Sequence, residues 1–130
     1  MLSLPPELEA AIAAALREVP SSQWQSAARR ISQRYRNADV ARRNSEVRNA
    51  PPPSREPHSA IGYAALVLPA TYAQLMGAMR ATALRAPTFQ PTTMLDLGSG
   101  PGTALWAAVE HWPGLETMQA WERDLLSIDL

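Results

Sequence analysis

The chain has 130 residues, 46% of them hydrophobic, and a formal net charge of zero. This length suits one ordinary domain, and the hydrophobic fraction excludes global disorder. The absence of cysteine excludes disulfides and thiolate-bound metals, and we predict no metal site. No apolar run approaches the roughly 20 residues of a membrane span. The N-terminus lacks the basic start and apolar core of a secretion signal, so we expect a cytoplasmic protein without membrane contact.

Charge is distributed unevenly along the chain. Residues 29–48 contain seven arginines and two acids, seven minus two giving a local charge of +5, whereas residues 86–130 contain one arginine and six acids. Such asymmetry is typical of a nucleic-acid-facing part joined to an acidic part. An ordinary solvated helix face is the alternative interpretation. The candidate phosphate-binding side chains are Arg29, Arg30, Arg34 and Arg36.

Residues 1–50 predict an N-terminal helical region. A first helix runs from the proline pair at residues 5–6 to Pro20, with one apolar stripe between them. The second helix opens with a predicted capping box, in which Ser22 is the N-cap and Gln25 reaches back, and it weakens past Asn37. The predicted buried stripe of this second helix comprises Trp24, Ala27, Ala28, Ile31, Tyr35 and Ala38.

A proline-rich segment at residues 51–57 predicts a stiff, extended linker and is the best candidate for a domain boundary. Residues 58–91 then predict two further helices ahead of a sheet. The first is short and ends near Leu66, and the second is opened by Pro69 and ends near Arg85. The predicted inner face of the longer helix comprises Tyr72, Leu75, Met76, Met79 and Ala83.

Residues 92–130 change to an α/β pattern. Residues 92–97 are short, apolar and followed by glycines, which predicts a buried parallel strand. A helix is predicted at residues 103–111, a second strand at 116–121 and the first turn of another helix at 124–130. The predicted fold class is therefore α/β, with an N-terminal helical region followed by the first β-α-β unit of a Rossmann-like sheet. Such sheets have five or six strands, so we expect this sheet to be truncated.

The glycine-rich turn after the first predicted strand is the main candidate site, since turns of this kind hold nucleotide-like ligands at the start of a helix. A P-loop requires a lysine, which is absent here. The dinucleotide fingerprint requires a third glycine where this chain has Thr103. The spacing instead resembles motif I of class I S-adenosylmethionine-dependent methyltransferases, and its residues are Asp96, Gly98, Gly100 and Gly102.

A second acidic residue supports this interpretation. Glu122 follows the second predicted strand, at the place where a carboxylate accepts hydrogen bonds from a ribose diol. Asp124 is expected either to contact the ligand or to cap the next helix. The alternative is a degenerate loop that keeps the turn and binds nothing.

Several segments together resemble the bacterial relatives of the mitochondrial small-subunit ribosome assembly proteins of the methyltransferase-like group. The resemblance implies an N-terminal helical region, a methyltransferase-like domain and association with small-subunit ribosomal RNA. It also implies an iron–sulfur cluster held by cysteines, which this sequence lacks. The segments that carry it are Leu4 to Leu8, Ile31 to Arg36, Tyr63 to Ala73, Leu95 to Trp106 and Trp121 to Asp124.

By this resemblance, the methionine end of S-adenosylmethionine is held by Asp96 and the loop glycines, and its ribose by Glu122. Ser99 is a candidate donor to the cofactor carboxylate. The motifs for catalysis and acceptor binding follow the fourth strand in such sheets and are not in this sequence. We therefore predict the N-terminal part of a methyltransferase-like protein that acts on or binds small-subunit ribosomal RNA, and we leave turnover open.

The sequence is also compatible with two functions other than that of a methyltransferase. One is a non-catalytic ribosome assembly factor that binds RNA through the arginine-rich helix and has a degenerate cofactor loop. The other is a purely structural fragment without a ligand. Because a two-stranded ribbon with open edges is marginally stable alone, self-association through the open sheet edge is also expected.

Overall fold

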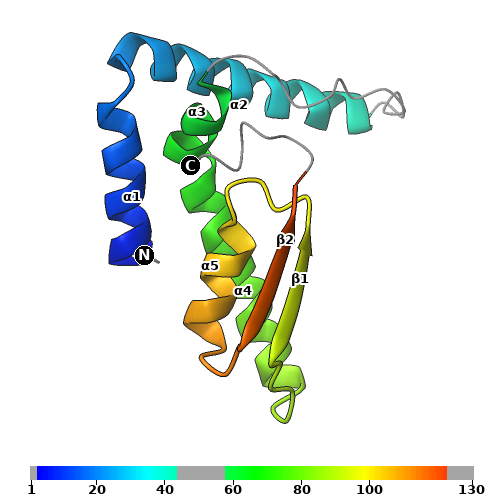
Figure 1. Cartoon of the computed structure of the whole chain (residues 1–130). Helices are drawn as coiled ribbons and strands as arrows, with labels where there is room; N and C mark the ends of the chain where they lie inside the picture. The colour runs from blue at the N-terminus through cyan, green and yellow to red at the C-terminus, as the bar shows by residue number, and fades with distance from the viewer. Residues whose placement is uncertain (1–2, 44–57, 123–130) are drawn as a thin grey trace.

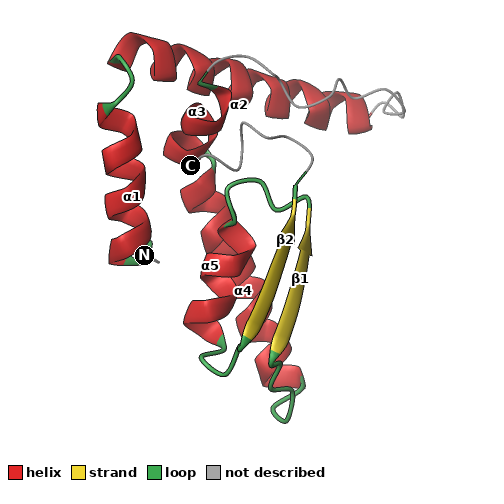
Figure 2. Ribbon diagram, viewed as in Figure 1, coloured by secondary structure: helices red, strands yellow, loops and turns green. Residues whose placement is uncertain are grey.

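Helices followed by a small parallel sheet make up the molecule, which confirms the predicted α/β class (Figure 1). The computed structural model describes residues 3–43 and 58–122. The expected linker at residues 51–57 and the helical turn at 124–130 lie outside these ranges. Figure 2 shows the elements in chain order: α1 (Pro6–Arg17), α2 (Ser21–Arg43), α3 (Ser59–Leu66), α4 (Leu68–Arg85), β1 (Thr93–Leu97), α5 (Thr103–His111) and β2 (Thr117–Trp121).

The first two helices are separated by Pro20. In α1, Pro6 occupies the first turn, where its missing N–H costs no hydrogen bond. The carbonyl of Pro20 accepts the N–H groups of Gln23 and Trp24 at 2.9 and 3.4 Å, so α2 begins directly after it. The predicted capping box is therefore wrong. Ser22 lies inside the helix, because the Pro20 carbonyl closes the first turn two residues earlier than predicted.

Small residues allow α2 and α3 to pack closely. Ala27 and Ala28 of α2 are buried, as the predicted stripe requires, and Gly62 of α3 is buried opposite them. A Cβ built on Gly62 would lie 2.8 Å from the Ala28 nitrogen and 3.0 Å from the Ala27 Cβ. Because real Cβ atoms do not approach this closely, only glycine at position 62 permits this helix crossing.

The hydrophobic core is centred on α4. Leu68 and Tyr72 are the largest fully buried side chains, and Met76 lies one turn further along the same face. This confirms the predicted inner face. The core cluster also takes residues from α1, α3 and α5, so α4 joins the N-terminal helices to the β-α-β unit; the members are Leu8, Ala64, Leu68, Tyr72, Met76 and Ala107.

Among the described residues, no single helix is long and apolar enough to cross a membrane. The segment from Ala60 to Leu66 and the helix α4 would meet the length and hydropathy criteria only as a pair, which is bent by 60°. Both helices bury residues in the core described above.

The sheet consists of β1 and β2 in parallel, with Thr93 opposite Thr117 and Leu97 opposite Trp121. The predicted strand positions are confirmed, but the predicted burial of the first strand is wrong. Leu95 and Leu97 are 53% and 68% exposed, and Trp121 is 64% exposed. These side chains share one face of the sheet, because side chains alternate along a strand and Leu97 is paired with Trp121. The other face of β1 is half-buried and packs against α5. Burial on both faces requires helices on both sides.

Candidate functional site

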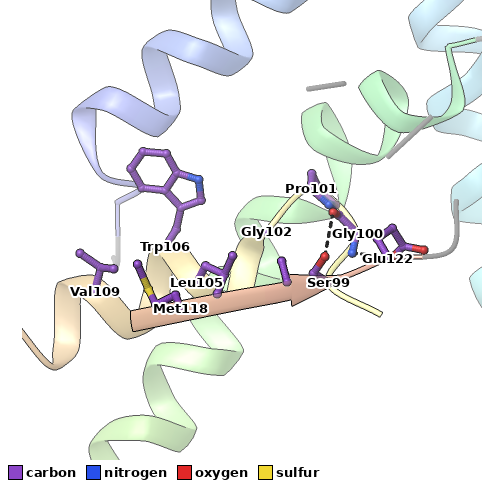
Figure 3. A pocket seen from close by; sticks show the side chains of 10 residues that line it. Ser99, Gly100, Pro101, Gly102, Leu105, Trp106, Val109, Met118 and Glu122 are labelled. Carbon is purple, nitrogen blue, oxygen red and sulfur yellow. Dashed lines mark hydrogen bonds between the residues drawn. The ribbon is translucent and has the colours of Figure 1, made fainter. Parts of the chain in front are cut away.

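The carboxyl ends of β1 and β2 form the candidate site. Parallel pairing places the two strand ends side by side, so the loop at residues 98–102 meets Glu122. The N–H of Gly100 donates to Glu122 Oε2 at 2.7 Å, and the N–H of Gly98 donates to the Trp121 carbonyl at 2.7 Å. Figure 3 shows Ser99, Gly100, Gly102 and Glu122 together at this end. Gly98 joins them through its bond to Trp121, and Asp96 is close enough to Glu122 for the two charges to interact.

Three glycines give the loop its shape. Gly98, Gly100 and Gly102 have φ values of 74°, 53° and 74°, in the left-handed region that other residues rarely adopt. Among the described residues, no atom beyond the chain neighbours lies within 4 Å of a Cβ built on Gly98 or Gly100. These two glycines therefore serve the backbone conformation and leave open space beside the loop, whereas Gly62 is required by packing.

Asp96 lies on the helix-facing side of β1 and is half-buried. Its Oδ2 atom is buried, and no described residue donates a hydrogen bond to it. Burial raises the pKa of the Asp96 carboxyl first, and repulsion from Glu122 raises it further. A buried acceptor without a donor costs free energy and is characteristic of functional sites.

The first residue of α5 has a similar feature. Thr103 is only 4% exposed, and its Oγ1 atom also has no hydrogen-bond partner among the described residues. In the sequence, Thr103 stands out only because it replaces the third glycine of the dinucleotide fingerprint. Its burial could not be inferred from that comparison, because it depends on the packing of α5 against α4 and β1.

A cavity of about 440 Å³ extends from the loop along the side of α5 and β2. Figure 3 shows its polar end at Ser99, Gly100 and Glu122. The other end is apolar. Trp106 packs against the core and also lines this end. The further apolar lining residues on α5 and β2 are Leu105, Val109, Met118 and Ala120.

The arginine-rich helix α2 carries the second set of predicted residues. Arg29, Arg30 and Arg36 are exposed. Arg30 and Arg36 each donate to a serine four residues earlier, Ser26 and Ser32, at 2.8 Å. The side chain of Arg34 and the residue Asp124 lie outside the described part of the chain. Within that part, no three His, Asp or Glu side chains gather into a metal-binding group.

Comparison with known proteins adds a family assignment to this geometry. The family model described as "Mitochondrial small ribosomal subunit Rsm22" matches residues 57–129, which is more than half of the chain. The matched range contains the glycine loop, β2 and Glu122. No curated protein matches the sequence.

Proposed function

Because this chain belongs to the Rsm22 family of the mitochondrial small ribosomal subunit, we propose that it is a methyltransferase-like protein that works on the small subunit. We further propose that its glycine loop binds S-adenosylmethionine. The expected site of action is small-subunit ribosomal RNA, in the cytoplasm of the source cell.

One arrangement carries this proposal: the Asp96 Oδ2 atom, to which no described residue donates, the glycine loop, and Glu122 at the same end of two parallel strands. An ionised carboxylate can accept hydrogen bonds but cannot donate them, so it suits a ligand that is rich in donors. S-adenosylmethionine supplies an activated methyl group on its sulfonium, and it has an ammonium and ribose hydroxyls as donors. The residues present fit this ligand.

The proposed roles divide between the two strand ends. Asp96 accepts a hydrogen bond from the ammonium of the methionine end, while Gly98 and Gly100 let the ligand lie close to the backbone. Glu122 accepts from the ribose hydroxyls. A carboxylate has about four lone-pair sites. The same carboxylate accepts the N–H of Gly100, so one residue would link the ribose to the glycine loop.

Calorimetric titration with S-adenosylmethionine and S-adenosylhomocysteine tests the cofactor site. We expect binding by the protein and a loss of about tenfold or more on Gly98→Ala, because the new methyl group enters the open space and the left-handed conformation costs roughly 1–2 kcal/mol. Gly114→Ala is the matched control, since Gly114 also has open space but no positive φ. Absence of binding of both ligands, or equal binding by both variants, would contradict the proposal.

A second function, a non-catalytic RNA-binding assembly factor, is favoured by the exposed arginines of α2. Arg29 and Arg36 are seven residues apart and thus lie on one helix face. Arginines that contact phosphates make affinity fall steeply with salt. We propose that this face contacts ribosomal RNA, whether or not the loop binds the cofactor.

Salt-dependent RNA binding tests this second function. The double substitution Arg29→Gln and Arg36→Gln should reduce the slope of log affinity against log salt by about two, roughly one for each phosphate contact. Glutamine maintains helix propensity, so α2 should stay folded. Arg17→Gln, at the exposed end of α1, is the control and should leave the slope unchanged. An unchanged slope in the double variant would exclude this face as the RNA contact.

A further inference from the structure

Glu122 closes the glycine loop with a carboxylate of the chain itself, through the 2.7 Å hydrogen bond from the Gly100 N–H. We propose that Glu122 is a specificity-determining residue that excludes phosphate-bearing ligands from the loop by acting as the loop's own anion. This inference deepens the proposed function and rests on it for the identity of the ligand that is admitted.

The backbone N–H groups of residues 98–102 all donate within the chain, so none of these five residues offers a free N–H to a phosphate. The N–H groups of Gly98 and Ser99 donate to the Trp121 carbonyl at 2.7 and 3.4 Å. The N–H of Gly102 donates to the Ser99 carbonyl at 3.0 Å, and Pro101 has no N–H. Gly100, whose N–H is bonded to Glu122, completes the set. Every N–H from residue 98 to residue 102 is thus used within the chain.

Dinucleotide-binding loops work in the opposite way. They direct N–H groups at the start of a helix toward the diphosphate, and the helix dipole favours its negative charge. Here the loop also feeds a helix, α5, through Gly102. The favourable position for an anion beside this loop is occupied by the Glu122 carboxylate.

Charge strengthens the exclusion. Asp96 and Glu122 lie close enough to repel each other, and this repulsion contributes to the raised pKa of Asp96. A phosphate that approaches the loop would add to this negative charge. The carboxylates at this end therefore disfavour a nucleoside that carries phosphates and suit one whose attached group carries an ammonium.

The test is an NMR titration of the amide of Gly100 with inorganic pyrophosphate and with ADP. Four proteins are compared: the wild type, Glu122→Gln, Glu122→Ala and the control Glu116→Gln. Glu116 is exposed ahead of β2, so its substitution removes the same charge away from the loop. Glutamine keeps an acceptor without the charge, whereas alanine removes both. We expect no saturable shift in the wild type or control, and an affinity for pyrophosphate at least about tenfold higher in Glu122→Ala.

The variants also separate the two causes of exclusion. A gain in both variants supports repulsion, and a gain only in Glu122→Ala supports occupation of the Gly100 N–H. A saturable shift of Gly100 in the wild type would overturn the inference, as would folded variants that gain no affinity. If the wild type binds S-adenosylmethionine and also pyrophosphate at Gly100, only this inference fails. If it binds neither, the proposed cofactor fails while the exclusion stands.

Discussion

Gly62→Ala should destabilise the fold by about 1–3 kcal/mol, the usual cost of overpacking. The same substitution within a helix ordinarily stabilises it by about 0.5–1 kcal/mol, because alanine loses less backbone entropy on folding. The sign reverses here because the new methyl carbon would lie 2.8 Å from the Ala28 nitrogen. That atom belongs to the backbone of α2, so relief requires the two helices to separate.

Gly77→Ala is the matched control. Gly77 lies in the middle of α4, is exposed, and has no atom within 4 Å of a built Cβ. We expect this variant to be more stable than the wild type by about 0.5–1 kcal/mol. Urea denaturation followed by circular dichroism measures both changes. A Gly62→Ala protein as stable as Gly77→Ala would show that α2 and α3 do not pack as the structure has them.

The elements of the fold could be predicted because their signals are local. The stripe of α4 at Tyr72 and Met76 recurs at helical spacing, and Pro69 marks the helix start to within a residue. The start of α2 was predicted wrongly at Ser22, because the carbonyl of Pro20 competes with a serine side chain and the sequence does not rank the two. Gly62 gave no signal at all, since its role depends on which helix lies opposite.

The candidate site shows the same division. The spacing of Asp96 and the loop glycines, and the position of Glu122 after the second strand, indicated which residues would meet. The direct hydrogen bond from Gly100 to Glu122 was not predicted, because it depends on the register of two strands and the left-handed turn between β1 and α5. The exposure of Leu97 was missed for a similar reason, since a strand's pattern does not say how many faces are covered.

Asp96→Asn should lower cofactor affinity about ten- to a hundredfold, which corresponds to the loss of one hydrogen bond to a charged group. The same substitution should stabilise the protein at neutral pH. Asparagine has the shape of aspartate without its charge, so it removes both the desolvation of Asp96 and its repulsion from Glu122. Binding and stability are expected to change in opposite directions, which a merely structural role for Asp96 would not produce.

The stability difference between the wild type and Asp96→Asn should depend on pH. Because the pKa of Asp96 is raised above its ordinary 3.8, the folded state holds its proton more strongly than the unfolded state does. The resulting stability is fully present below the unfolded pKa and is lost as pH rises through the folded pKa. The wild type should therefore lose stability relative to Asp96→Asn as pH rises above about 4.

Urea denaturation at several pH values measures this difference, and calorimetry on the same proteins measures binding. Glu116→Gln removes an equal charge from an exposed site, so it controls for the change in net charge. If Asp96→Asn and Glu116→Gln gave the same stability difference from the wild type at every pH, a free-energy cost specific to the Asp96 charge would be excluded. If Asp96→Asn is more stable and binds less, the half-buried carboxylate is maintained for its ligand at the expense of the fold.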